Sequence, residues 1–481
     1  MLFPTVSFGV FFLCVFIGYW YVFRRSAERR AFLVAASYLF YAFWDWRFCF
    51  LLLASSAANW GFGLLIGRER EHFRRKLWLV LAIILNLALL GFFKYYNFFA
   101  DTANGILASL AASPSAGTGF RFPALAIIMP VGISFYTFKA LSYVFDVYLC
   151  ALPPVKRFLD VALYVSFFPQ IASGPIVHAA DFIPQIESAT ALGQEPGSKP
   201  IRSARASSLF LSGLVKKMVF ANFLSTLFVD PVLSDPASFG SLEVALAAIG
   251  YSVVIYSDFS GYSDMAIAIA LLLGFETPAN FNRPYASFSV TEFWKRWHIT
   301  FSSWLRNYLY FSMGGSRFGK VRTLVALFFT MLLGGLWHGA AMTFVVWGLM
   351  QGVALAVERA FSYGNERSKR PALAAIQVAL TFLFVTLSWI VFRAPSLEAV
   401  GTWFAALADF SKGPTLLTPL VAVLIVSALA MHAFPERARK ALGNLWVSAP
   451  VMARGVAIAL VFACLSVVSM SGVAPFIYFQ F

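Results

Sequence analysis

Two histidines in aromatic surroundings are the residues of this sequence best suited to proton transfer. His298 follows Trp297, and His338 lies between Trp337 and Gly339, forty positions further along the chain. Because an imidazole exchanges protons near neutral pH, either side chain could act as a general base toward a hydroxyl group. The alternative for His338 is a structural hydrogen bond between helices, and for His298 a place at the membrane interface. The residues alone leave both roles open.

Two acidic residues are further candidates, because they interrupt the apolar segment 244–274. Asp258 and Asp264 are six positions apart and do not share one helical face. They could orient a histidine, line a polar cavity or cap a broken helix. The sequence has no HExxH, GxSxG or Walker motif and no histidines spaced as metal ligands. We therefore expect no metal site and no competing catalytic constellation.

The rest of the sequence must position these groups inside a membrane. Of 481 residues, 60% are hydrophobic and only 12% are charged, whereas a soluble domain carries about 25% charged residues. The net charge of +15 comes largely from Lys and Arg in short loops between apolar segments, the positive-inside pattern. The composition therefore predicts an all-α, polytopic integral membrane protein and argues against a nucleic-acid partner.

Basic loops set the expected topology. The loops at 24–30, 68–76 and 359–370 can all lie on the cytoplasmic side. The first apolar run has no basic residue before it and four arginines after it, which predicts a retained span with the N-terminus outside. We expect a helical hairpin over 31–67 that turns at Asp45–Arg47. We expect further spans over 77–93, 157–176, 244–274, 372–392, 416–433 and 450–470, and loops over 111–119 and 184–206.

Glycine and proline predict broken or re-entrant helices at two places. Pro130 and Gly132 interrupt the apolar segment 122–149, and Gly334–Gly335 precede His338. A helix from Thr323 to Leu333 would span roughly 16 Å, about half of a hydrocarbon core ~30 Å thick. On this estimate His338 lies well inside the membrane, with the glycines allowing a bend or a close backbone approach. In all we expect about eleven to thirteen membrane helices in one domain, residues 1–481.

The sequence resembles the membrane-bound O-acyltransferase (MBOAT) family, in particular its bacterial alginate O-acetyltransferase branch. The matching segments include PVGISFYTFKALSYVFDVY at 130–148, DFSGYSDMAIAIALLLGF at 258–275, NFNRPYASFSVTEFWKRWHITFSSWLRNYLY at 280–310 and GGLWHGAAMTFVVWGL at 334–349. They occur in order over nearly the whole chain. The sequence departs from the branch at Lys139, Asn222 and Gln351, where Gln, Asp and His are favoured.

The resemblance implies a fold of many helices around a central polar cavity. It also implies that His338 is the essential histidine and His298 its partner, within a catalytic region at about 258–350. Residues that could support them or line the cavity are Asp258, Asp264, Asn282, Arg283, Tyr285, Trp294, Arg296, Arg306 and Trp337. Arg296 or Arg306 could orient a thioester and, with His298, stabilise an oxyanion.

The resemblance also implies a function. Acetyl would move from acetyl-CoA, a substrate and not a bound cofactor, to an alginate-like exopolysaccharide outside the inner membrane of a bacterium. Transfer could be direct or pass through a periplasmic acetyltransferase, with polysaccharide-export machinery and membrane lipids as partners. Alternative acceptors are peptidoglycan, cellulose or another envelope component. A secondary transporter is the alternative from another class, since acidic residues in spans and broken helices are also transporter features.

Overall fold

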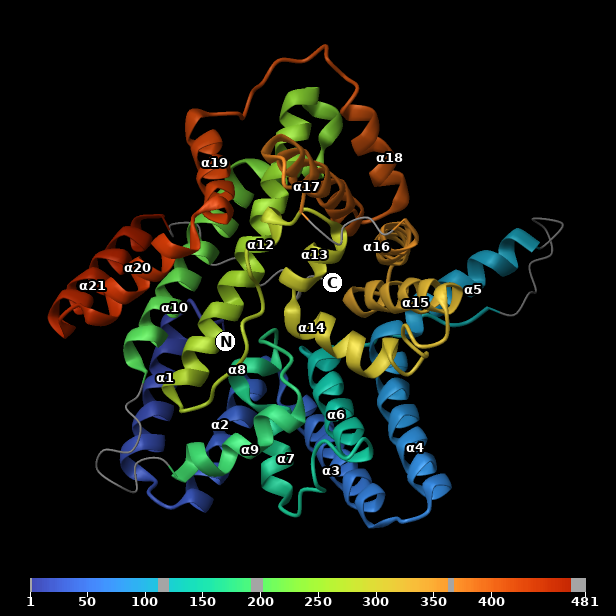
Figure 1. The fold of residues 1–481 in the computed structure, drawn as a ribbon, viewed down its shortest axis with the longest axis vertical. Coiled ribbons are helices and arrows are strands. Elements are labelled where there is room, and N and C mark those ends of the chain that lie inside the picture. The colour runs from blue at the N-terminus through green and yellow to red at the C-terminus, as the bar shows by residue number, and fades with distance from the viewer. Residues whose placement is uncertain (1, 111–120, 192–201, 362–366, 469–481) are drawn as a thin grey trace.

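The computed structural model describes residues 2–110, 121–191, 202–361 and 367–468. Within these ranges the regular structure is helical (Figure 1). Six helical stretches are long and apolar enough to cross a membrane: 47–68, 72–109, 203–234, 241–272, 320–338 and 371–393. A seventh span is formed if α19 and α20, which bend by 97°, count as one broken span. The all-α, multi-pass fold is confirmed, while the count of eleven to thirteen membrane helices stays a prediction.

The N-terminal part is a bundle of short and medium helices. Its helices are α1 (Val6–Ile17), α2 (Ser26–Asp45), α3 (Arg47–Arg68), α4 (His72–Leu90), α5 (Tyr96–Leu110), α6 (Ile133–Tyr148), α7 (Phe158–Ser166), α8 (Phe168–Ile171) and α9 (Ala179–Ala191). The predicted hairpin at Asp45–Arg47 is present, with only Trp46 between α2 and α3. Residues 121–130 are not helical. Helix α6 begins directly after Gly132, whose backbone angles are left-handed.

Two sequence expectations in this part need correction. The segment 157–176 is not one span, because α7 ends at Ser166 and the chain turns at Phe167 before α8. Pro169 lies in the first turn of α8, a position where a missing N–H costs little. Part of the expected loop at 184–206 is helical, in α9 and in the start of α10. The expected loop at 111–119 lies outside the described residues.

The C-terminal part contains helices of very different lengths, among them the longest, α12. They are α10 (Ser203–Val215), α11 (Asp230–Ser234), α12 (Ser241–Leu272), α13 (Val290–Arg296), α14 (Ile299–Trp304), α15 (Lys320–His338), α16 (Met342–Ala360), α17 (Pro371–Arg393), α18 (Leu397–Ala406), α19 (Pro419–Ala433), α20 (Glu436–Ser448) and α21 (Val451–Val468). The 32-residue α12 runs through the middle of the molecule and is buried along most of its length (Figure 1). Helices α20 and α21 lie together at the outer edge.

Five segments adopt the wider π-helical turn: Gly18–Val22 (η1), Gly91–Tyr95 (η2), Lys216–Phe223 (η3), Ser225–Val229 (η4) and Leu305–Tyr310 (η7). Such turns are rare in proteins and often occur at functional sites. Here η2 joins α4 to α5, and η7 continues α14.

Helices α15 and α16 form an antiparallel hairpin that carries His338 at its turn. A Cβ atom added to Gly335 would lie 2.4 Å from the carbonyl oxygen of Phe344 and 2.8 Å from the Cα of Gly348. The two glycines therefore let the helix backbones touch. Gly335 serves close approach and not a bend, because α15 continues to His338 over 19 residues. That is about 28 Å of helix, so the helix does not end at Leu333 as expected, while the depth of His338 in the membrane stays a prediction.

Candidate active site

His298 lies at the break between α13 and α14. It is the N-terminal cap residue of α14 and has left-handed backbone angles, φ 42° and ψ 54°. Few non-glycine residues adopt this region, and those that do are held by their surroundings. Its side chain is completely buried, against the rings of Phe259 and Phe301. The break therefore turns the imidazole into the protein interior.

Asn280 orients His298 and assigns its ring protons. The Asn280 Oδ1 atom accepts hydrogen bonds from the Thr300 backbone N–H (3.3 Å) and hydroxyl (2.9 Å), while its Nδ2 donates to Ser263 Oγ (3.2 Å). Because Oδ1 is an acceptor, His298 Nδ1, 3.1 Å away, must be the donor to it. Its Nε2 atom is then the basic nitrogen. It is buried and has no hydrogen-bond partner among the described residues.

His338 is the last residue of α15 and is 3% exposed. Its ring is surrounded by the aromatic side chains of Trp337, Trp347, Phe392 and Phe301, with ring centroids 5.0 to 5.5 Å away. Three of these residues come from α15, α16 and α17, and the fourth from α14. Four helices thus enclose the imidazole in an environment with little access to bulk water.

His298 and His338 both pack against the ring of Phe301. The Phe301 centroid lies 4.9 Å from that of His298 and 5.2 Å from that of His338. The two imidazole centroids cannot be further apart than the sum of these distances. The structure therefore brings two residues forty positions apart in the sequence against the same aromatic ring.

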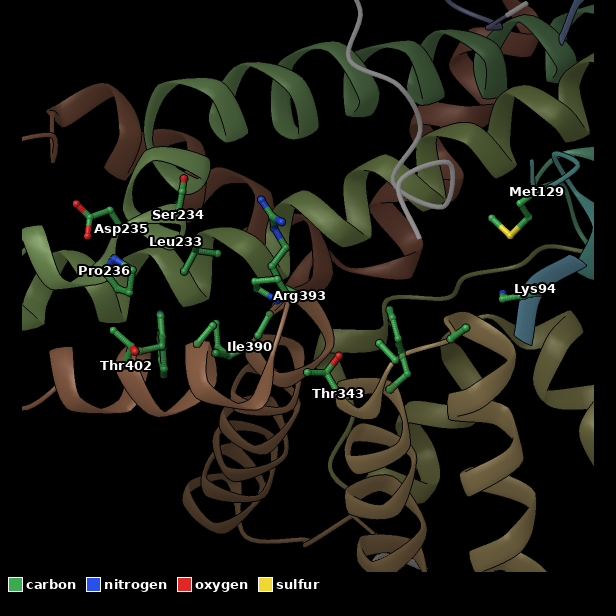
Figure 2. Close-up of a pocket in the computed structure, with 17 residues that line it drawn as sticks. Lys94, Met129, Leu233, Ser234, Asp235, Pro236, Thr343, Ile390, Arg393 and Thr402 are labelled. Atoms are coloured by element: carbon green, nitrogen blue, oxygen red, sulfur yellow. The ribbon is translucent and has the colours of Figure 1, made fainter. Parts of the chain in front are cut away.

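Two cavities lie at the turn of the α15–α16 hairpin, and one of them contacts His338. A small cavity of about 70 Å³ contacts His338 and Trp337 and shares Lys94 and Met129 with a larger one of about 810 Å³. The larger cavity also contacts the hairpin turn at Ala341 and extends between α17, α18 and the segment 233–236 (Figure 2).

A third cavity, of about 590 Å³, lies toward the other end of the α15–α16 hairpin. It contacts Ile299, next to His298, and Met331, one and a half to two turns before His338. Its polar lining comprises Thr291, Trp294, Lys295, Ser302, Ser303, Arg306, Tyr310, Ser316, Thr330 and Arg359. Three cations thus line this cavity, whose lining includes neither histidine.

The two acidic candidates form ion pairs with neighbouring lysines of η3. The Lys217 ammonium lies 2.6 Å from Asp258 Oδ1, and both side chains are buried. The Lys216 ammonium lies 2.7 Å from Asp264 Oδ2 and 2.9 Å from Ser260 Oγ. Both pairs join η3 to α12. This geometry suits the packing of η3 against α12.

The other candidates divide between the third cavity and its surroundings. Trp294 and Arg306 line the cavity, and Trp294 Nε1 donates to Gln351 Oε1 (3.2 Å). Arg296 pairs with Glu292 one turn earlier. Trp337 packs between Phe301 and His338. None of these contacts tests a catalytic role, which stays a prediction.

The three candidates in the segment before α13, Asn282, Arg283 and Tyr285, make their contacts away from Phe301. The Tyr285 hydroxyl donates to the Ser252 carbonyl (2.5 Å). Arg283 reaches the Phe434 carbonyl (3.3 Å), and the Asn282 side chain is exposed. These contacts stabilise the chain around α13 and do not reach His338.

Sequence reasoning missed Asn280 and Lys94. Asn280 is one of several asparagines beside a turn, and its sequence carries no sign that it faces a histidine 18 positions later. Lys94 was a stronger signal, because it follows the apolar segment 77–93 directly. A single cation next to a span is more often an interfacial anchor, which is why its neighbours could not be inferred.

Comparison with known proteins gives a consistent result. Residues 154–397 match the model of the membrane-bound O-acyltransferase family. The chain is 34% identical over 541 residues to a protein of Pseudomonas aeruginosa described as "probable alginate O-acetylase AlgI", and 35% identical over 522 residues to one of the same description from Azotobacter vinelandii. Both alignments cover 100% of each chain. A peptidoglycan O-acetyltransferase of Helicobacter pylori is 36% identical over 428 residues, covering 83% of this chain and 78% of that one.

Proposed function

Because this chain belongs to the membrane-bound O-acyltransferase family, we propose that it moves an acetyl group across a bacterial inner membrane for O-acetylation of an extracytoplasmic polysaccharide. The donor would be acetyl-CoA, and the acceptor an alginate-like exopolysaccharide. The observation that carries this proposal is the packing of His298 and His338 against one ring, with a cavity against His338 at the hairpin turn and a basic cavity beside Ile299, the residue after His298. A donor and an acceptor could approach the same pair of imidazoles from opposite sides.

The third cavity has the chemistry expected of a donor site. Lys295, Arg306 and Arg359 suit the phosphates of a coenzyme A thioester, while Leu305 and Met331 give the interior an apolar wall. Arg359 also begins the basic loop 359–370, which the positive-inside rule assigns to the cytoplasm. A pantetheine arm entering here would bring its thioester toward His298 without carrying the nucleotide across the membrane.

The proposed reaction is attack of a hydroxyl oxygen on the thioester carbonyl. His338 takes the hydroxyl proton, a new C–O bond forms, and the resulting oxyanion collapses with cleavage of the C–S bond. The proton then passes to the thiolate to give free coenzyme A. His298 Nε2, the nitrogen left free by the bond to Asn280, is a second hydrogen-bond acceptor, which would orient the attacking hydroxyl before His338 takes its proton. A transient acetyl-histidine at His338 is the covalent variant of this scheme.

The test uses purified protein in nanodiscs with acetyl-CoA labelled in the acetyl group. Release of coenzyme A and label retained on the protein are measured for the native chain and for His338→Ala. We expect release to fall by about 10²–10⁴ in the variant, the range for loss of a general base. Label retained by the native chain and lost in the variant would identify the covalent route. Equal release from both would exclude His338 from the reaction.

The acceptor is tested by adding polymers to the same assay. Alginate, peptidoglycan and cellulose fragments are each supplied alone and with a periplasmic acetyltransferase of the same organism. The names of the relatives support the first two, at 34–36% identity. Acetylation of alginate only when the second protein is present would mean that this chain hands acetyl to a partner. The transporter alternative is disfavoured by family membership and by the pairing of Asp258 and Asp264 with lysines.

A further inference from the structure

Lys94 lies on the π-helical turn η2 and reaches the end of the helix that carries His338. Its ammonium donates to the carbonyl oxygens of Trp337 (2.7 Å) and His338 (3.2 Å), and to Ser134 Oγ on α6 (3.4 Å). All three N–H donors of the ammonium are therefore used by protein oxygens. This lysine makes no ion pair within 4.0 Å among the described residues, and its two shortest hydrogen bonds go to backbone carbonyls.

The neighbouring residue extends the same contact by one position. The Tyr95 hydroxyl donates to the Leu336 carbonyl (2.8 Å). Three successive carbonyls at the C-terminus of α15 are thus bound by two successive side chains of another helix. The last four carbonyls of a helix have no partner within the helix, and a cation there is favoured by the helix dipole. In an apolar surrounding, each unsatisfied carbonyl would cost several kcal/mol.

Lys94 also stands between the two cavities at the hairpin turn. With Met129 it belongs to the lining of both, while His338 contacts only the smaller one. Figure 2 shows Lys94 and Met129 at one end of the larger cavity, and Asp235 and Thr402 at the other. A hydroxyl group travelling from the larger cavity to His338 would pass this lysine.

We propose that Lys94 is the positioning residue for His338. By binding the terminal carbonyls of α15, Lys94 fixes the backbone of His338 and so the orientation of its imidazole. The Lys94 side chain also lies between the larger cavity and that imidazole and restricts access to it. It acts through His338 and not on the substrate, since its donors are already used. The proposal rests on the proposed role of His338 and adds a residue on which that role depends.

A matched control is available in Lys139. Its ammonium is buried, whereas Lys94 is half-buried, and it donates to Gln170 Oε1 (2.9 Å) and lies over the rings of Tyr164 and Phe182. These partners lie on α8, α7 and α9, not on α15. Lys139→Met therefore removes an interior lysine without touching the His338 backbone.

The first measurement is steady-state release of coenzyme A from acetyl-CoA by Lys94→Met, Lys94→Arg, Lys139→Met and the native chain. We expect kcat to fall by about a hundredfold in Lys94→Met, the cost of a misplacement near 1 Å. The KM for acetyl-CoA should stay unchanged, because the proposed donor cavity does not include Lys94. Lys94→Arg, which keeps charge and donors, should recover most of kcat. A native kcat in Lys94→Met, with His338→Ala inactive, would overturn the proposal and leave the proposed function standing.

The second measurement needs no turnover, so it tests Lys94 even if acetyl-CoA proves not to be the donor. Diethyl pyrocarbonate modifies accessible imidazoles, and mass spectrometry of the peptides gives its rate at each histidine. We expect the rate at His338 to rise several-fold in Lys94→Met and to stay native in Lys94→Arg and Lys139→Met. His72, which is exposed, serves as the internal standard. An unchanged His338 rate in Lys94→Met would overturn the proposal.

Discussion

His298 has a defined tautomer because Asn280 is itself held from two sides. Thr300 donates to the Asn280 oxygen and Ser263 accepts from its nitrogen, so the amide cannot rotate without losing bonds. The imidazole therefore presents Nε2, and not Nδ1, to the interior. At the scale of single residues, the hydrogen bond to Asn280 therefore determines that Nε2 is the acceptor nitrogen of His298.

This choice can be tested at Asn280. Asn280→Ala removes the acceptor for Nδ1, and we expect kcat for coenzyme A release to fall by up to about a hundredfold, since the ring loses its orientation. Asn280→Asp keeps an acceptor at the same place and should retain much of the activity. Asn222→Ala is the control, because among the described residues the Asn222 amide makes its hydrogen bond to Met218 Sδ and not to a histidine. Native kcat in Asn280→Ala would contradict the tautomer assignment.

At the scale of helices, close backbone contact fixes the hairpin that carries His338. The contact between Gly335 and Gly348 leaves no room for a side chain. Packing of small residues in this way is a common means of joining helices in membranes, where the hydrophobic effect contributes little. Any residue added at this contact must separate α15 from α16 and move the hairpin turn.

Gly335→Ala tests this role. A methyl group 2.4 Å from the Phe344 carbonyl forces the helices apart, and we expect a loss of about 1–3 kcal/mol of stability together with reduced activity. Thermal unfolding in detergent and the coenzyme A assay measure the two effects. Gly61→Ala on α3 is the control, because its new Cβ would meet nothing within 4 Å. In a helix interior that change should stabilise by up to about 1 kcal/mol.

The ion pairs between η3 and α12 make a second prediction at this scale. Lys217→Met leaves the buried Asp258 carboxylate without its ammonium, so we expect a cost of about 3–5 kcal/mol and a clear fall in Tm. The double variant Lys217→Met with Asp258→Leu should regain much of that stability, since both charges are gone. It should also keep native kcat per folded molecule. Loss of kcat in the stable double variant would show that Asp258 takes part in the reaction.

The sequence predicted elements better than it predicted their ends and neighbours. Apolar length and basic loops were enough for the α2–α3 hairpin, α12 and α17, because the bilayer imposes a simple pattern on such segments. They failed for 157–176, where proline and a turn at Phe167 divide the segment. Aromatic context singled out both histidines, but the partners of Asp258 and Asp264 depend on which helix packs beside α12. That information is not local.

At the scale of the whole molecule, the cavities lie toward opposite ends of one hairpin. The basic lining of the third cavity and the basic loop 359–370 predict that it faces the cytoplasm, and the larger cavity at the hairpin turn the opposite side. This arrangement would let two solutions reach one pair of residues without a continuous channel.

Single cysteines can test the sidedness. Thr402→Cys in the larger cavity and Ser303→Cys in the third are made in a chain whose native cysteines, Cys14, Cys49, Cys150 and Cys464, are replaced. We expect a membrane-impermeant maleimide to label Thr402→Cys in spheroplasts, and Ser303→Cys only in inverted vesicles. Labelling of both from the same face would contradict the proposed topology.

The left-handed backbone at His298 determines which variants can isolate its chemistry. An alanine there would keep a conformation that costs an ordinary residue about 1–2 kcal/mol, so lost activity could reflect a disturbed turn between α13 and α14. Asparagine and glycine adopt these angles more readily. His298→Asn therefore removes the imidazole while preserving the turn. At the helical His338, by contrast, alanine is the cleaner deletion.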